Sequence, residues 1–86
     1  MNYFVYMLIS THKNRISTYV GYTKNVEIRL NQHNSSKGAK YTRGKKWNII
    51  YKKKYLSKNI AMKEEYILKN DSRLRNNIKK KYLLKN

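Results

Sequence analysis

Two segments near the N-terminus decide the fold: YFVYMLIS at residues 3–10 and STYVG at residues 17–21. Both are rich in aromatic and β-branched residues, which favour β-strands. The polar residues 11–15 between them predict a connecting loop. We therefore expect the two strands to pair back as an antiparallel hairpin.

A helix is expected directly after this hairpin, over about residues 26–34. Thr23 or Asn25 can cap its N-terminus, because a short polar side chain can accept a hydrogen bond from the first free N–H groups. Glu27 would then lie in the positively polarised first turn. The segment 35–46 is polar and basic and is expected to be a loop, with Gly38 and Gly44 as its flexible points.

The second half of the chain predicts one strand and two helices. A strand is expected over residues 47–56, where Trp47, Ile49 and Tyr51 alternate with Asn48, Ile50 and Lys52. Ser57 can cap a helix that runs to about residue 69. Asp71 or Ser72 can cap a basic helix over about residues 72–84.

These elements follow one another in the order β-β-α-β-α-α. The order predicts an α+β fold in which a three-stranded antiparallel sheet is flanked by helices. No repeat and no Pro/Gly-rich linker divides the sequence. Residues 1–86 are therefore expected to form a single domain.

Charge is the strongest compositional signal. The chain carries 21 Lys and Arg residues against four acidic ones, a formal net charge of +17. Such a surplus on a small domain predicts salt-sensitive attraction to a polyanion, above all a nucleic acid. A genome rich in A and T would also enrich Lys and Asn, but it would not remove Asp and Glu.

Other classes of function fit the sequence less well. The absence of Cys excludes a disulfide framework, a thiolate metal site and a cysteine nucleophile. The N-terminal apolar segment is too short to span a membrane, and no expected helix pairs a broad apolar face with a basic one. We therefore expect a soluble cytoplasmic protein without a membrane partner.

Four polar side chains are expected to converge at one end of the hairpin. Tyr6 and Tyr19 lie on the paired strands, and Arg29 and His33 lie four residues apart on one face of the first helix. That face borders the apolar side of the helix, so both groups should lie beside the sheet. Two phenols, a guanidinium and an imidazole would then meet.

These residues carry a resemblance to a known family. FVY at residues 4–6 and YVG at residues 19–21 stand where two short motifs of the GIY-YIG nucleases belong, with Arg29 and His33 ten and fourteen residues after Tyr19. The basic stretch 37–45 and the helical stretch 61–66 are similar to later parts of the same family. The chain thus resembles the small single-domain bacterial branch of GIY-YIG nucleases, which is related to the UvrC incision domain of DNA repair. The first motif lacks its Gly and Ile.

The resemblance implies a role for each of five residues. Glu65 would hold one Mg²⁺ or Mn²⁺ ion. Tyr6 would orient or deprotonate the attacking water, which requires that Arg29 and the cationic surroundings lower its pKa from about 10. Arg29 would also stabilise charge on the phosphate. His33 would accept the tyrosine proton or bond a phosphate oxygen, and Tyr19 would position the phosphate or the water. Which tyrosine is the base stays open.

Helical periodicity and the resemblance disagree about the metal ligand. On a helical wheel Glu64 lies within the apolar stripe and Glu65 lies at its edge, so periodicity alone makes Glu64 the odd buried carboxylate. The resemblance places the ligand at Glu65 instead. With only four acids in the chain, both readings favour a site with one metal ion.

The basic loop is the expected nucleic-acid-binding surface. Its cations would contact the phosphate backbone, or would be a solvated charge run with no such role: Lys37, Lys40, Arg43, Lys45 and Lys46. Trp47 could stack on a base, but a single Trp at the start of a strand is more often part of the core.

Taken together, the sequence predicts a metal-dependent endonuclease that hydrolyses DNA phosphodiester bonds, with branched or single-stranded DNA among the substrates it could take. The alternative is a non-catalytic basic module that binds RNA or associates with the ribosome. Metal-dependent turnover separates the two, whereas binding does not, because any chain with this net charge binds DNA.

Overall fold

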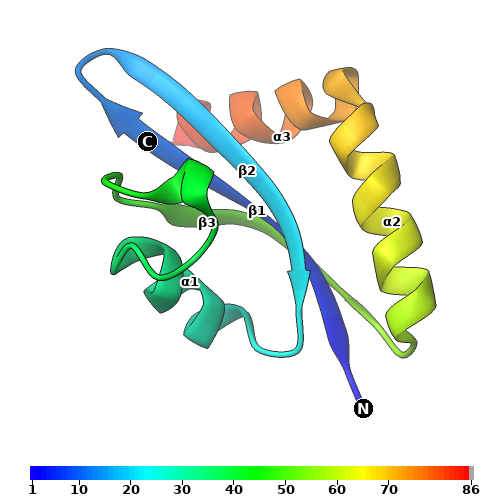
Figure 1. Ribbon diagram of the computed structural model, residues 1–86. Helices are drawn as coiled ribbons and strands as arrows, with labels where there is room; N and C mark the ends of the chain where they lie inside the picture. The colour runs from blue at the N-terminus through cyan, green and yellow to red at the C-terminus, as the bar shows by residue number, and fades with distance from the viewer. Residues whose placement is uncertain (86) are drawn as a thin grey trace.

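The computed structural model describes residues 1–85 of the 86-residue chain. Three strands form one antiparallel sheet, and helices cover both of its faces (Figure 1). The predicted α+β fold and its element order are confirmed. The elements are β1 (Tyr3–His12), β2 (Arg15–Thr23), α1 (Val26–Asn34), the 3₁₀ turn η1 (Lys40–Thr42), β3 (Asn48–Tyr55), α2 (Lys58–Asn70) and α3 (Ser72–Lys85).

The hairpin is longer and its turn tighter than the sequence predicts. β1 and β2 pair without interruption from Phe4–Thr23 to His12–Arg15. Only Lys13 and Asn14 form the turn, with φ of 49° and 66°. Positive φ at both central residues matches the twist of paired strands. The expected loop at residues 11–15 was therefore too long, because Lys-Asn is a weaker turn signal than Asn-Gly.

The sheet has the order β2-β1-β3, with β1 in the centre. The pairing of β1 with β3 shifts between Met7, which pairs with Tyr51, and Leu8, which pairs with Ile49. Because of this β-bulge, the side chains of β3 from Tyr51 onward point to the face of the sheet opposite to the one that simple alternation predicts. Ile49 consequently packs with the cluster on the α1 face, whereas Tyr51 packs on the opposite face. The prediction that Trp47, Ile49 and Tyr51 lie on one face of the sheet is therefore wrong for Tyr51, which lies beyond the bulge.

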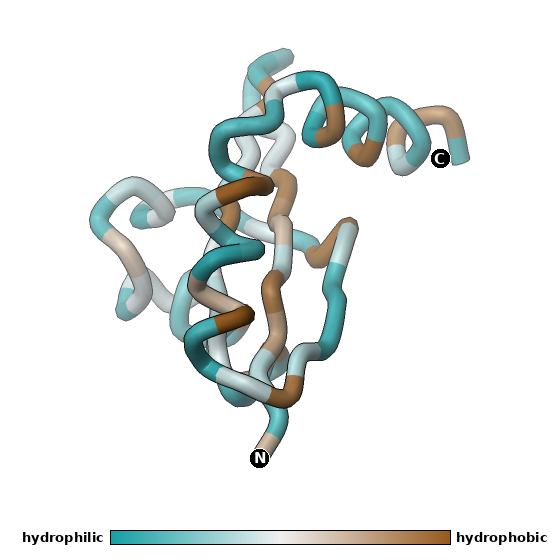
Figure 2. Tube along the Cα trace, turned by 90° about the vertical axis from the view of Figure 1, so that its right-hand side faces the viewer, coloured by the Kyte–Doolittle hydropathy of each residue, from teal (hydrophilic) through white to brown (hydrophobic). Residues whose placement is uncertain are grey.

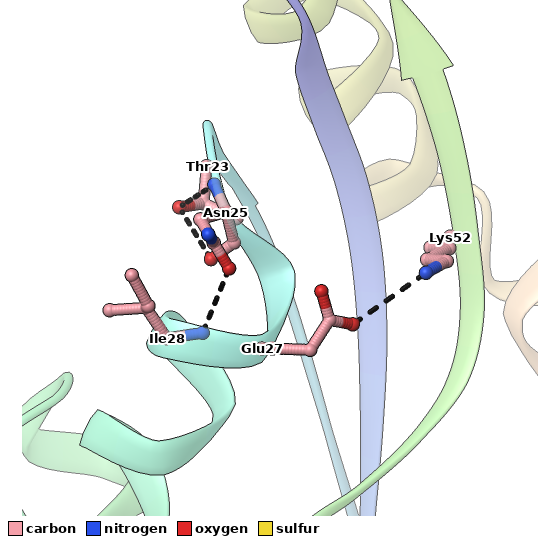
Figure 3. Close-up of polar contacts among 5 residues, drawn as sticks. All are labelled: Thr23, Asn25, Glu27, Ile28 and Lys52. Atoms are coloured by element: carbon pink, nitrogen blue, oxygen red, sulfur yellow. Dashed lines mark hydrogen bonds and ion pairs between the residues drawn. The ribbon is translucent and has the colours of Figure 1, made fainter.

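Side-chain caps define where the helices begin. Asn25, rather than Thr23, caps α1, since its Oδ1 accepts a hydrogen bond from the Ile28 N–H at 3.0 Å (Figure 3). Asp71, rather than Ser72, caps α3 by accepting from the Leu74 N–H at 3.0 Å. Ser57 caps α2 as predicted.

An ion pair links α1 to β3. The Glu27 carboxylate and the Lys52 ammonium lie 3.6 Å apart, and both side chains are largely exposed (Figure 3). An exposed pair of this kind contributes little to stability, at most about 1 kcal/mol. The ion pair therefore does not fix these two residues. Glu27 is positioned by the first turn of α1, and Lys52 is positioned by strand β3.

Two apolar clusters hold the layers together. On one face of the sheet, α2 packs on the cluster Val5, Met7, Val20, Ala61 and Leu68. On the other face, α1 packs on the cluster Tyr6, Leu8, Val26 and Trp47. Trp47 is 1% exposed, so the expectation that it belongs to the core is confirmed. Tyr6 belongs to the α1 face and so does its strand neighbour Tyr19.

α3 contributes less to the core than α2. It has no buried residue, and its apolar residues appear as isolated segments between hydrophilic ones near the C-terminus (Figure 2). Among the described residues, no helix is both long enough and apolar enough to cross a membrane.

Candidate active site

Tyr6 and Tyr19 form the sheet side of the candidate site. Tyr6 pairs with Gly21, and Leu8 pairs with Tyr19, so the two tyrosines lie on adjacent strands and on the same face. Their ring centroids are 6.4 Å apart. The convergence of both phenols predicted from the hairpin is therefore present.

Gly21 allows the Tyr6 side chain to take this position. A Cβ atom built at Gly21 would lie 2.5 Å from the Tyr6 hydroxyl and 2.8 Å from the ring carbon that carries it. The Tyr6 side chain therefore lies across the backbone of β2 and brings its hydroxyl to Gly21. Any residue larger than glycine at this position would push the phenol away.

His33 joins Tyr6 to the loop after α1. The Tyr6 hydroxyl lies 2.9 Å from His33 Nε2, and His33 Nδ1 lies 2.8 Å from the Thr42 hydroxyl oxygen. Tyr6 and His33 are 1% and 0% exposed, and Thr42 is also buried. The three side chains thus form a continuous hydrogen-bonded chain inside the protein.

The last hydrogen bond of this chain sets the direction of the others. The Thr42 hydroxyl donates its only proton to the Ala39 carbonyl at 2.8 Å. It must then accept a hydrogen bond from His33 Nδ1–H. The Nε2 atom of the neutral imidazole is left with its lone pair, which accepts the Tyr6 proton. The chain therefore points the phenolic proton of Tyr6 toward His33.

The loop of residues 35–46 is built around His33. A Cβ atom at Gly38 would overlap the His33 ring, since Nδ1, Cε1 and Cγ are its nearest neighbours. Trp47 Nε1 donates to the Thr42 carbonyl at 2.9 Å, which holds the η1 turn against the core. Gly38 was expected only as a flexible point, but its role is to leave room for the imidazole. Thr42 was not predicted as a site residue. The only signal for it in the sequence is its place in the basic stretch 37–45, which is similar to a later part of GIY-YIG nucleases.

The pKa of Tyr6 is raised, not lowered. Burial is the largest cause, and repulsion from Tyr19 adds to it. Arg29 lowers the pKa through its charge and a side-chain hydrogen bond, while the Glu65 carboxylate raises it further. The expectation that cationic surroundings lower the Tyr6 pKa is therefore wrong, because loss of solvation outweighs the single nearby guanidinium.

The pKa of His33 is lowered, first by burial and then by the positive charge of Arg29. The imidazole is consequently neutral near pH 7, in agreement with the hydrogen bonds that it makes. A neutral His33 can accept a proton, whereas a protonated one could not.

Arg29 and Glu65 complete the site from two different helices. Arg29 lies on α1, and its charge acts on both Tyr6 and His33. Glu65 lies on α2, on the far face of the sheet, and its charge also reaches Tyr6. Figure 1 shows α2 running alongside the edge strand β2.

The two neighbouring glutamates face different groups. Glu65 acts on Tyr6, and its carboxylate lies 3.6 Å from the Lys69 ammonium one turn further along α2. Burial is the largest cause of the raised pKa of both Tyr51 and Tyr55. Glu64 raises both values further through its charge, and it also hydrogen-bonds Tyr55. Glu64 therefore belongs to the surroundings of β3, and Glu65 to the surroundings of Tyr6.

The Glu65 side chain is 18% exposed, so its carboxylate is partly shielded but still reaches solvent. No group of three or more His, Asp or Glu side chains that could hold a metal ion occurs within residues 1–85. A lone carboxylate fits a hard divalent cation only if water and substrate oxygens supply the other ligands, as Mg²⁺ commonly accepts. The donor set is compatible with one ion of this kind.

The basic loop adds an exposed aromatic ring that sequence reasoning did not single out. Tyr41 is 54% exposed and stacks on Tyr19 with ring centroids 6.3 Å apart and planes at 23°. The Lys45 ammonium lies 4.4 Å from the Tyr41 ring centroid. Lys45 is half-buried in this contact, and the four remaining cations of the loop are exposed: Lys37, Lys40, Arg43 and Lys46.

The family model for the GIY-YIG catalytic domain matches residues 2–81. The chain belongs to the GIY-YIG family. The resemblance seen in the motifs of β1 and β2 is thereby confirmed over nearly the whole chain.

Several relatives of the chain are UPF0213 proteins. A UPF0213 protein of Oceanobacillus iheyensis is 52% identical over 54 residues, which cover 62% of this chain and 63% of that protein. A UPF0213 protein of Limosilactobacillus reuteri is 38% identical over 85 residues, 95% of this chain and 82% of that one. The solution structure of a UPF0213 protein from Bacillus halodurans is 38% identical and covers 99% of this chain and 84% of its own, with a TM-score of 0.47.

The neutral His33 predicts a pH dependence of folding stability. Its pKa is lower in the folded protein than the usual value of about 6.5, so below that pH the unfolded chain binds more protons than the folded one. The free energy of unfolding should therefore fall between pH 7.5 and 5.5, by at most about 1.4 kcal/mol per pH unit, the limit for one proton. Urea denaturation at each pH measures it.

The exposed His12 supplies the matched control. The His12→Gln variant should keep the full pH dependence, since this side chain lies near the hairpin turn and away from the Tyr6 chain. A flat stability profile in the parent, or its loss in His12→Gln, would contradict the assignment to His33.

Proposed function

We propose that this protein is a metal-dependent endonuclease that hydrolyses phosphodiester bonds of DNA in the cytoplasm with one Mg²⁺ or Mn²⁺ ion. Membership of the GIY-YIG catalytic-domain family supports a nuclease-type function and a nucleic-acid substrate. The observation that carries the proposal is the buried hydrogen-bonded chain from Tyr6 through His33 to Thr42, next to Arg29 and Glu65. A phenol that is hydrogen-bonded to a neutral imidazole beside a guanidinium and a carboxylate can move a proton, which binding of nucleic acid alone does not require.

The chain supplies a route for the proton that the attacking water must lose. Tyr6 passes its proton to His33 Nε2 in the same step in which its oxygen takes a proton from the water, because burial disfavours a free phenolate beside an imidazolium. Thr42 keeps Nε2 unprotonated until that moment by accepting the Nδ1–H hydrogen bond. Because the resting phenol is protonated, His33 is needed for Tyr6 to act as a base. This geometry favours Tyr6 over Tyr19 as the base, since Tyr6 is the one bonded to His33.

Arg29 and Tyr19 act on the phosphate in this proposal. The planar guanidinium of Arg29 stabilises the charge that builds on the phosphoryl oxygens. Tyr19 lies beside both Tyr6 and His33, with its ring centroid 4.9 Å from that of His33, and positions the phosphate or the water.

Glu65 would hold the metal ion. Its carboxylate is paired with the Lys69 ammonium at 3.6 Å, and the ion would replace this partner. Such an ion supplies Lewis-acid stabilisation of the phosphoryl group and the leaving oxygen. Lys69 would keep the carboxylate oriented before the ion arrives.

The exposed Tyr41 supports a substrate with unpaired nucleotides, such as single-stranded or branched DNA. In a duplex the faces of the bases are covered by their neighbours, so an aromatic ring can stack only on an unpaired or displaced base. Tyr41 offers such a ring beside Tyr19. The Lys45 ammonium, 4.4 Å from the ring centroid, would give way to the base and contact the phosphate of the same nucleotide. The exposed cations of the loop, from Lys37 to Lys46, extend this surface along the backbone of the strand.

Removing one hydroxyl tests the base. Tyr6→Phe keeps the packing volume, so the protein should melt as a folded domain while nicking of supercoiled plasmid falls by about 10²-fold or more. Tyr51→Phe, a half-buried tyrosine on the opposite face, is the control and should nick at the parent rate. Parent-like nicking by a folded Tyr6→Phe variant would show that Tyr6 is a packing residue.

Two adjacent substitutions test the metal ligand. Glu65→Gln should abolish nicking in Mg²⁺ and Mn²⁺, while DNA binding is kept or tightens slightly because a negative charge is lost. Glu64→Gln should nick within a few-fold of the parent, since Glu64 faces Tyr51 and Tyr55. EDTA should stop the parent. If instead Glu64→Gln is inactive and Glu65→Gln active, the assignment is shifted by one residue; if both nick like the parent, the non-catalytic binding module is the better reading.

Truncating the exposed ring tests the unpaired base. Tyr41→Ala should weaken binding of a single-stranded oligonucleotide by about 1–3 kcal/mol, the usual contribution of one stacked base. Binding of the matching duplex should change much less. Tyr66→Ala removes a tyrosine of α2 that is even more exposed and should affect neither. Equal losses for single strand and duplex in a fluorescence anisotropy titration would argue against stacking by Tyr41.

A further inference from the structure

A cationic hollow lies next to the candidate active site and shares Arg29 with it. It has a volume of about 450 Å³ and lies where β1 begins and β2 ends, between the first residues of α1 and α2. It is lined by Tyr3, Tyr22, Thr23, Lys24, Arg29 and Lys58.

The lining of this hollow suits an anion with several oxygen atoms. Three of the six residues carry a positive charge and the other three carry a hydroxyl, and none of these described lining residues is acidic. The Thr23 hydroxyl is engaged with the backbone of Asn25, so Lys24, Arg29 and Lys58 are the principal donors. A water molecule occupies about 30 Å³ in the liquid, so the hollow has room for a phosphate group with part of its hydration shell.

The backbone places the three cations independently of one another. Lys24 follows the last residue of β2 and precedes the capping residue Asn25, and its ammonium lies 5.8 Å from the ring centroid of Tyr3. Arg29 lies on α1. Lys58 is the first residue of α2, directly after the capping residue Ser57. Three elements therefore bring positive charge to one concave surface, which differs from a run of lysines along a single exposed helix.

Arg29 connects this hollow to the reaction centre. It lines the hollow, and its charge also acts on Tyr6. The register of the hairpin gives the order of the sites: Phe4 pairs with Thr23 at the hollow, Tyr6 with Gly21, and Leu8 with Tyr19. The hollow and the Tyr41 ring that stacks on Tyr19 are thus on opposite sides of Tyr6.

The spacing along β2 matches that of neighbouring nucleotides. Thr23 and Gly21 are two residues apart, which is about 7 Å along a strand. A nucleic-acid strand advances about 3.4 Å per nucleotide in a duplex and more when it is stretched. A strand whose cleaved phosphate lies at Tyr6 would therefore place a phosphate one or two nucleotides away at the hollow.

We propose that Lys24 and Lys58, next to Arg29 at the border with the reaction centre, form a binding site for a second phosphate group of the substrate strand, on the side of the cleaved bond opposite to Tyr41. This inference rests on the proposed nuclease function for the position of the cleaved phosphate. Two different subsites, a phosphate pocket on one side and an aromatic ring on the other, would allow the strand to enter in one direction only.

The phosphate site can be tested without any cleavage. In an NMR titration of the ¹⁵N-labelled protein with inorganic phosphate, at constant ionic strength set by chloride, the amides of Thr23, Lys24 and Lys58 should shift and saturate. The double variant Lys24→Gln/Lys58→Gln should lose this saturable response. Lys63→Gln/Lys80→Gln removes the same charge from exposed positions of α2 and α3 and should keep it. A response that never saturates, or that survives in Lys24→Gln/Lys58→Gln, would overturn the proposal.

The substrate strand supplies the second test. Oligonucleotides that each carry one neutral methylphosphonate linkage should show one position, on a single side of the cut, where loss of charge slows cleavage about tenfold, as expected for lost charge-assisted hydrogen bonds. In Lys24→Gln/Lys58→Gln that position should have no additional effect, as a double-mutant cycle requires. A comparison of oligonucleotides with and without a terminal phosphate shows whether an internal or a terminal phosphate is bound. If the parent cleaves but no such position exists, this inference fails alone; if no cleavage occurs, the NMR result still decides the phosphate site.

Discussion

The hydrogen bond between the Tyr6 hydroxyl and His33 Nε2 is the contact on which the rest of the candidate site depends. It crosses from the central strand to α1 between two side chains that are at most 1% exposed, where a lost partner is costly. The second ring nitrogen of His33 then needs its own partner, and Thr42 supplies it from a turn nine residues further along the chain. A strand, a helix and a loop are thus held in one arrangement by two polar contacts in the interior.

Two glycines make this arrangement possible by what they lack. Gly21 leaves space for the phenol of Tyr6, and Gly38 leaves space for the imidazole of His33. Neither position requires unusual backbone dihedral angles; each requires the absence of a Cβ atom. The glycine of the second motif of the family therefore has a steric reason in this chain, namely the passage of the tyrosine of the first motif across β2.

The electrostatics of the molecule change sharply over a short distance. The surface carries most of a net charge of +17, whereas the Tyr6–His33–Thr42 chain is neutral and buried. Burial keeps the phenol protonated and the imidazole unprotonated, so the proton has a defined donor and a defined acceptor. Arg29 stands at the boundary between these regions. Its charge acts inward on the hydrogen-bonded chain and outward on the hollow beside it, so the proposed proton transfer and the proposed phosphate site share one side chain.

Sequence patterns by themselves determined the order of the elements, the bounds of α1, the basic loop and the placement of both tyrosines on one hairpin. These are local properties: strand and helix periodicity, caps and charge are all visible within a few residues. They also named Arg29 and His33 as neighbours on one helical face. The tertiary structure alone decided how Tyr6 is protonated, because the pKa of a phenol depends on burial by segments far away in the chain. It also decided that Thr42 supports His33, that a bulge turns Tyr51 away from Ile49, and that Glu65 rather than Glu64 faces Tyr6. Each of these depends on which atoms meet across the sheet, and a helical wheel or an alternation pattern contains no information about that meeting.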